Sequence, residues 1–369
     1  MTQKFDVALN AKINEFAKKF GIIRTDINDA EVFEDFSNYI VASNLLEEEL
    51  ENVKSVSTNK AQGIDGIVII VNNKLVSEEF DLEKFETIDS IKIKIGFIQS
   101  TMQKSFDEQK LNAFTDSVVA FLNKTFAIEP FSTIYNKLLD DSSNFIDKID
   151  ETPRISLFFL SAKTMHTITE EKINAERSKI IGRQELENLC ILDRFICLQK
   201  EEIKIEYDKI SKYHTVRLKF DHNVQLSSVD NVEMSLLSTI KFSELKKMIL
   251  TSDNNLKERL FIENVRNYIG RTPVNSDIKK TLDTNSERLF FPFLNNGLAI
   301  ICDKLERAPV KDKEFILTFP RIINGCQTTN ELFKKYKDTS DNIDDIEIVA
   351  KVISTNDNNL KKNDYICCK

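Results

Sequence analysis

Two polar residues stand at the ends of the two most apolar stretches in the first third of the chain. Asp65 lies in GIDGIVIIV (residues 63–71), and Gln99 ends IKIKIGFIQ (residues 91–99). Runs of β-branched residues bounded by glycine or Asn-Asn predict buried strands. If the two strand ends are neighbours, Asp65 and Gln99 offer oxygen ligands to Mg²⁺ or Mn²⁺. Such a cation polarises a phosphodiester and lowers the pKa of an attacking water.

An acidic helix is expected before these strands. Apolar residues recur at helical spacing through residues 30–52, with acidic residues between them, and Glu34 is one of these acids. Residues 111–122 return to the helical period after the second strand. Spacing alone also allows an ordinary explanation, in which Asp65 ends a strand, Gln99 is a polar strand-end residue and Glu34 is a solvent-facing charge like Glu31.

This order of helix, strand, strand and helix resembles the PD-(D/E)xK nucleases of the restriction-endonuclease-like class. In that class an Asp on one strand and a Glu or Gln on the next hold the metal, and a preceding helix often adds a Glu. The resemblance implies that Asp65 and Gln99 bind Mg²⁺ or Mn²⁺ and that Glu34 assists the metal or its water.

The catalytic lysine of this class is missing from its usual place. Two positions after Gln99 the chain has Thr101, which cannot replace an ammonium that steadies negative charge. Either hydrolysis is impaired or a lysine reaches in from elsewhere. Lys92, Lys94 and Lys104 are considered for this role, and Lys104 is included in the predicted catalytic set.

A second group of polar residues surrounds two Asn-Gly turns. Asn295-Asn296-Gly297 precedes a predicted strand, and Asn324-Gly325 follows another. Thr328 and Glu331 have capping-box spacing, so a helix should begin directly after the 324–327 loop and present free amides to an anion. Two tight turns also explain these residues without any binding role, and Phe290, Phe291 and Phe293 just before them are expected in the core.

Several segments of the C-terminal part resemble the abortive-infection phage-resistance (AIPR) family in their order and spacing. They are ENVRNYIGRTPVNSDIKKTL, FFPFLNNGLAIIC and PRIINGCQTTNELF. The upstream segments SELKKMIL, GIDGI and FIQS extend the resemblance over nearly the whole chain. The resemblance implies a role in defence against phage. The free amides, the polar residues of the two turns and the nearby arginine give the predicted phosphate-contacting set, which is Arg266, Asn295, Asn296, Gly297, Asn324, Gly325, Gln327 and Thr328.

Composition restricts where an anion could bind and which other chemistries are open. The chain has 51 basic and 59 acidic residues, a net charge of −8, so a basic coat for nucleic acid is excluded and any anion site must be local. The six cysteines and three histidines lack the spacing of a zinc site. No glycine-rich nucleotide fingerprint occurs. Without a membrane-length apolar stretch or a secretory signal, the expected location is the cytoplasm.

The expected fold combines α/β and α+β parts. Residues 1–125 should form a nuclease-like domain with a mixed sheet flanked by helices, and 126–220 a middle or connecting region. Residues 221–369 should form an α+β AIPR-type domain that is short at its C-terminus. In the middle region, residues 155–160 and 213–220 are predicted strands, and residues 168–205 are predicted to be helical. Later strands are expected at 315–319 and 346–353.

Together these patterns predict an antiphage protein, with a magnesium-dependent endonuclease as the leading interpretation. The alternative is a nucleic-acid or nucleotide-binding sensing module in which catalysis is impaired. A third interpretation treats the C-terminal part as an oligomerisation scaffold. Expected partners are DNA or RNA, a nucleotide or phage-derived trigger, and a second copy of the chain.

Overall fold

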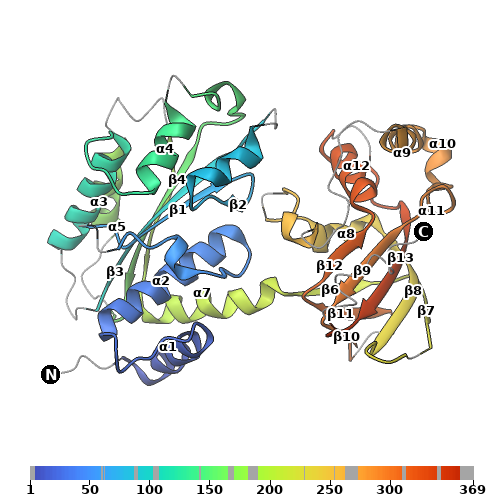
Figure 1. Ribbon diagram of the computed structural model, residues 1–369, viewed down its shortest axis with the longest axis horizontal. Coiled ribbons are helices and arrows are strands. Elements are labelled where there is room, and N and C mark those ends of the chain that lie inside the picture. The colour runs from blue at the N-terminus through green and yellow to red at the C-terminus, as the bar shows by residue number, and fades with distance from the viewer. Residues whose placement is uncertain are drawn as a thin grey trace. The chain divides into compact units, whose positions relative to one another are not determined.

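The chain forms two compact units, Met1–Ser211 and Lys212–Lys369 (Figure 1). The computed structural model describes residues 5–59, 61, 63–86, 90–102, 108–140, 143–164, 170–181, 190–227, 229–252, 254–261, 273–309, 313–338 and 342–357. Each unit has its own sheet and its own hydrophobic core.

The first unit is built on a five-stranded mixed sheet with the order β2-β1-β3-β4-β5. Strand β1 is antiparallel to both of its neighbours, whereas β3, β4 and β5 are parallel to one another. The strands are β1 (Gly66–Val71), β2 (Lys74–Leu75), β3 (Ile93–Thr101), β4 (Arg154–Ser161) and β5 (Ile191–Leu198).

Helices cover both faces of this sheet (Figure 1). Those on one face are α3 (Glu108–Leu122), α4 (Phe131–Leu139) and α5 (Glu170–Ile181), and those on the other are α1 (Val7–Lys19), α2 (Asp29–Leu46) and α7 (Lys200–Tyr213). Short 3₁₀ turns are η1 (Val53–Ser55), η2 (Glu79–Phe85) and η3 (Ile146–Lys148).

Local sequence explains the start of helix α2 and the way it packs. The side chain of Asn28 caps the helix by accepting a hydrogen bond from the Glu31 amide at 2.9 Å. The apolar residues that predicted this helix are buried, including Phe33 and Phe36. Gly96 of β3 lies directly beneath Leu45 of α2, so this helix packs closely on its face of the sheet.

Helix α3 packs closely on the opposite face. Phe97 of β3 stacks edge-on against Phe121 of α3, with 5.5 Å between ring centroids. Near the start of β1, Gly63 has a φ of +79°, and a Cβ there would lie 2.6 Å from the Ser117 Oγ and 2.9 Å from the Ala113 carbonyl oxygen of α3. Glycine is therefore needed at position 63 both for its backbone conformation and for the close approach of α3.

The middle region differs from its sequence prediction. The strand expected at 155–160 is β4, but the helix expected over 168–205 is interrupted by β5 between α5 and α7. Strand β5 is an edge strand, and most of its residues are exposed or half-buried. It therefore lacks the continuous apolar run that marks a buried strand in a sequence. Strands β4 and β5 complete the sheet of the first unit.

The second unit contains two sheets. A three-stranded antiparallel sheet has the order β10-β11-β6, and a five-stranded sheet has the order β12-β9-β13-β8-β7 with β13 and β9 parallel. Their strands are β6 (Thr215–Lys219), β7 (His222–Gln225), β8 (Met234–Lys241), β9 (Leu298–Cys302), β10 (Lys304–Arg307), β11 (Glu314–Thr318), β12 (Arg321–Asn324) and β13 (Glu347–Ser354).

One core joins both sheets to the helices of this unit, with members such as Phe220, Ile300 and Leu332. The helices are α8 (Phe242–Ile249), η4 (Glu258–Phe261), α9 (Pro273–Asp283), α10 (Asn285–Arg288), α11 (Phe291–Leu294) and α12 (Cys326–Lys337). None of the described helices is long and apolar enough to cross a membrane.

Two expectations for this unit are wrong in detail. Phe291 is buried as expected, but Phe290 is 57% and Phe293 82% exposed, because the short helix α11 turns a single apolar side inward. Helix α12 begins at Cys326 with Gly325 as its N-cap, so Thr328 lies inside the helix and does not cap it.

Candidate active site

Asp65 and Gln99 meet at one end of the sheet of the first unit. Gly66 of β1 pairs with Ile98 of β3, and the Asp65 amide donates to the Ile98 carbonyl oxygen at 2.8 Å. This register places Asp65 beside Gln99, whose Nε2 donates to the Asp65 Oδ2 at 2.9 Å. The amide therefore faces Asp65 through its nitrogen, and Nε2 also donates to the Ser100 carbonyl oxygen at 3.1 Å.

Ser100 is a contributor to this site that sequence analysis missed. Its backbone amide and its hydroxyl both donate to the Asp65 Oδ2, at 2.6 and 2.8 Å. Burial raises the pKa of Asp65, while the hydrogen bonds from Ser100 and Gln99 act in the opposite direction by favouring the ionised form. These bonds hold the Asp65 carboxylate in one orientation.

Helix α2 presents Glu34 to the same sheet end. Asn38, one helical turn after Glu34, donates from its Nδ2 to the Asp65 carbonyl oxygen at 3.1 Å, so this side of α2 lies against Asp65. Burial, reinforced by the negative charge of Asp65, raises the pKa of Glu34 to about 7. Among the described residues, Glu34 has no hydrogen-bond or ion-pair partner. Two carboxylates thus lie close enough to interact, and Glu34 is the one without a compensating partner.

A cation approaches from the opposite face of the sheet. Lys110, in the first turn of α3, donates from its Nζ to the Ser100 carbonyl oxygen at 2.9 Å. Its positive charge lowers the pKa of both Glu34 and Asp65. Lys110 could not be identified from the sequence. Residue spacing within a helix or a strand does not show that the start of α3 lies against the end of β3.

Lys92 and Lys94, two of the lysines considered from the sequence, do not take this position. Lys92 forms an ion pair with Glu151, and Lys94 pairs opposite Ile70, so both lie towards the start of β3 and away from Gln99. Lys104 lies outside the described residues. Thr101 is 4% exposed and continues the β3 ladder with β4.

The residues present can provide a partial cation site. Within the described ranges, no group of three or more His, Cys, Asp or Glu side chains is arranged to hold a metal ion. Glu34 and Asp65 are nevertheless hard oxygen donors, and no described residue donates to the Asp65 Oδ1. A divalent cation between them would relieve the repulsion that raises the pKa of Glu34. Gln99 would have to turn its amide by half a rotation to offer its oxygen.

The two Asn-Gly turns of the second unit also come together, but through internal contacts. Asn295 Oδ1 accepts hydrogen bonds from the Gly297 amide at 2.9 Å and from the Thr328 hydroxyl at 3.1 Å. A Cβ on Gly325, whose φ is +98°, would lie 2.8 Å from the Gly297 carbonyl oxygen. The polar groups of the two turns bind one another, so the main role of these contacts is to stabilise the fold.

The remaining predicted phosphate contacts are dispersed. Asn296 is exposed, Gln327 is half-buried in the first turn of α12, and Asn324 pairs with Ala299 at the end of β12. Arg321, the first residue of β12, forms an ion pair with Asp303 at 3.6 Å. Arg266 and Arg271, together with the Asn264-Val265-Arg266 motif, lie outside the described residues.

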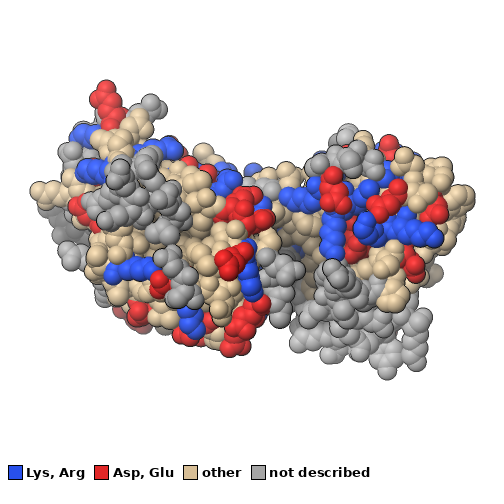
Figure 2. Space-filling model, turned by 90° about the horizontal axis from the view of Figure 1, so that it is seen from above, with Lys and Arg blue, Asp and Glu red and all other residues tan. Residues whose placement is uncertain are grey.

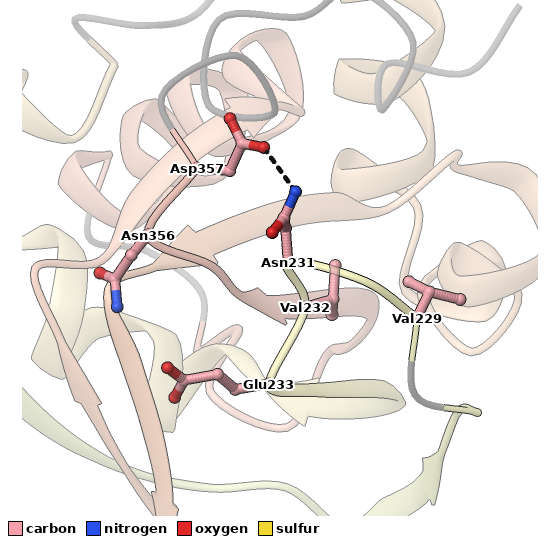
Figure 3. A pocket seen from close by; sticks show the side chains of 6 residues that line it. All are labelled: Val229, Asn231, Val232, Glu233, Asn356 and Asp357. Atoms are coloured by element: carbon pink, nitrogen blue, oxygen red, sulfur yellow. Dashed lines mark hydrogen bonds between the residues drawn. The ribbon is translucent and has the colours of Figure 1, made fainter.

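A hollow in the second unit has a different chemistry from either group. It encloses about 480 Å³ and is lined by Val229, Asn231, Val232, Glu233, Asn356 and Asp357 (Figure 3). Asn231 donates to Asp357 at 2.9 Å across it. Its lining contains two acids and no base, so it does not suit a phosphate. Figure 2 likewise shows acidic and basic side chains intermingled on the face it presents, with no large basic patch.

These observations define a two-unit α/β protein with a carboxylate site at a sheet end. Residues 261–364 match the family model described as AIPR protein. This match confirms the resemblance to the AIPR family for residues 261–364 of the C-terminal part. No curated protein and no solved structure matches the chain.

Proposed function

We propose that the chain is a metal-dependent nuclease of an abortive-infection system, acting on phosphodiester bonds of DNA or RNA. The observation that carries the proposal is the convergence of two carboxylates, Glu34 and Asp65, at the sheet end beside Gln99, with Glu34 lacking a hydrogen-bond or ion-pair partner among the described residues. Mixed-sheet topology with helices on both faces supports a restriction-endonuclease-like first unit. The second unit binds nucleic acid or a nucleotide and controls the first.

Each residue has a role in this proposal. Glu34 and Asp65 would hold Mg²⁺ or Mn²⁺, and Gln99 would join them through its amide oxygen once turned. Bound there, the cation would polarise the phosphate and activate water. The amide and hydroxyl of Ser100 fix the Asp65 carboxylate, so that the ligand geometry is set before substrate arrives.

The direct test is incubation of the purified full chain with labelled single- and double-stranded DNA and RNA, with Mg²⁺, Mn²⁺ or EDTA. We expect cleavage with either metal and none with EDTA. Asp65→Ala should abolish cleavage. Asp81→Ala, in η2, is a matched acidic control that should keep it. Cleavage that persists in Asp65→Ala would remove the site assignment.

A sensing module without catalysis is the second candidate, favoured by the buried threonine at position 101 of β3. In that case the phosphate contacts of Asn296, Gln327 and Arg266 carry the function. Metal-independent nucleotide binding, measured by calorimetry, would be lost in Gln327→Ala and unchanged in Asp65→Ala. The opposite pattern would exclude this candidate.

A further inference from the structure

We infer that Lys110, on helix α3, is a catalytic residue of the sheet-end site and contacts the phosphate that is cleaved there. This inference rests on the proposed nuclease function. It supplies a positively charged side chain near Gln99, where strand β3 has Thr101. Its basis is the position of the Lys110 ammonium, 2.9 Å from the Ser100 carbonyl oxygen.

Ser100 links Lys110 to Asp65. The amide and hydroxyl of Ser100 bind the Asp65 carboxylate, and the carbonyl oxygen of the same residue binds the Lys110 ammonium. Carboxylate and ammonium are therefore anchored to one residue of a strand that is hydrogen-bonded on both sides. A shared rigid anchor keeps two groups in a constant relative position, as catalysis by prior positioning requires.

The charges converge from both faces of the sheet. Glu34 comes from α2, which packs on one face, and Lys110 from α3, which packs on the other, while Asp65 lies at the strand end between them. The positive charge of Lys110 acts on both carboxylates. A phosphate reaching the cation held by Glu34 and Asp65 would therefore lie close to Lys110, which has three N–H donors for its oxygens.

The chemical role of Lys110 is electrostatic. In hydrolysis the oxygen of a water forms a bond to phosphorus, and the bond from phosphorus to the leaving oxygen breaks. The attacking water releases one proton to solvent, and the leaving oxygen takes one proton from solvent. Lys110 transfers no proton in this step and stabilises the charge that grows on the phosphate oxygens, an effect typically worth about 100- to 1,000-fold in rate.

A purely structural role for Lys110, in which it only anchors α3 to β3, predicts different results. The test compares Lys110→Met, which keeps the length of the side chain without its charge, with Lys110→Arg, which keeps a charge. Lys124→Met is the matched control, because this lysine follows the other end of α3 and pairs with the surface residue Asp140. Single-turnover cleavage with Mn²⁺, Mn²⁺ affinity by calorimetry and amide hydrogen exchange of β3 are measured for each.

We expect Lys110→Met to lower the cleavage rate by about 100-fold or more at saturating substrate. Its Mn²⁺ affinity should not fall, because removing a positive charge near Glu34 and Asp65 does not weaken cation binding, and β3 exchange should stay near wild type. Lys110→Arg should recover part of the rate, and Lys124→Met all of it. A wild-type rate in Lys110→Met would overturn the inference, as would equal losses in Lys110→Met and Lys110→Arg accompanied by faster exchange of β3.

The two levels of the proposal fail in different ways. If the wild-type chain neither cleaves nor binds Mn²⁺, the nuclease function fails and the role of Lys110 fails with it. If the wild type cleaves and Asp65→Ala does not, but Lys110→Met cleaves normally, the nuclease function stands and the role of Lys110 alone is removed.

Discussion

The sheet end of the first unit and the paired turns of the second use polar residues in opposite ways. At the sheet end, Glu34 and Asp65 repel each other, and Glu34 has no hydrogen-bond or ion-pair partner among the described residues. In the turns, Asn295 satisfies both the Gly297 amide and the Thr328 hydroxyl. Both groups were singled out in the sequence as places for phosphate chemistry.

The difference shows how a binding site can be distinguished from architecture. Polar groups that satisfy one another stabilise a fold, because each buried donor has an acceptor. Like charges held together without partners cost stability, and such an arrangement is a mark of functional sites. By this criterion the sheet end is the stronger candidate, and the turns serve first to join β9, β12 and α12.

The largest expected effect separates the two regions by activity. Asp65→Asn keeps the size of the side chain but removes a charged ligand, so cleavage should fall by about 100- to 1,000-fold. Thr328→Val removes a hydroxyl from the turn cluster and should leave the cleavage rate unchanged. Initial rates at saturating Mn²⁺ measure both. A large loss in Thr328→Val would show that the turns take part in catalysis.

The next effect separates the regions by stability. Gly325→Ala should destabilise the second unit by about 1–3 kcal/mol, because alanine is strained at a φ of +98° and its Cβ would meet Gly297. Hydrogen exchange of the full chain should accelerate in β9 and β12. Exchange in β1 and β3 serves as the internal reference and should not change. Unchanged exchange throughout would contradict the close packing of the turns.

A smaller loss is expected when the acceptor of the turn cluster is removed. Asn295→Ala leaves the Thr328 hydroxyl and the Gly297 amide without their shared acceptor, which should cost about 1 kcal/mol. Asn296→Ala, at the exposed neighbouring position, is the control and should have little effect on stability. Denaturant unfolding followed by exchange in β9 compares the two. If only Asn296→Ala weakens nucleic-acid binding, the exposed asparagine is the contact.

The smallest effect concerns the pH dependence of the sheet end. The pKa of Glu34 is raised by folding from its ordinary value of 4.5 to about 7, so the protonated form favours the folded state. This contribution is fully present below pH about 4.5 and is lost as the pH rises through about 7. In EDTA, thermal unfolding should show this loss in the wild type and not in Glu34→Gln. Saturating Mn²⁺ should reduce it. If the unfolding temperatures of the wild type and of Glu34→Gln changed with pH in the same way, the raised pKa of Glu34 would be contradicted.

Much of the first unit could be predicted from local patterns. The helix over 30–52 and the strands at 63–71 and 91–99 correspond to α2, β1 and β3, because buried elements carry their own periodicity. Strand β5 was missed because an exposed edge strand does not need a continuous apolar run. The contact between Asp65 and Gln99 follows from register alone once β1 and β3 are neighbours.

The rest of the site depends on tertiary packing. Ser100 and Lys110 could not be identified from spacing, because one acts largely through its backbone and the other comes from a helix on the far face of the sheet. For the same reason the exposure of Phe290 and Phe293 could not be predicted from an aromatic run. Strand β3 has Thr101 two positions after Gln99, and its own lysine, Lys94, lies towards the other end of the strand.

The position of helix α3, and with it that of Lys110, depends on Gly63. The absence of a side chain at position 63 lets the backbone of α3 settle against the start of β1, through Ala113 and Ser117. Lys110 lies one turn before Ala113 on the same helix, so any substituent at position 63 acts as a wedge that tilts α3 away from the strand. Gly63, which has no side chain, thereby sets how close the Lys110 ammonium comes to the sheet-end site.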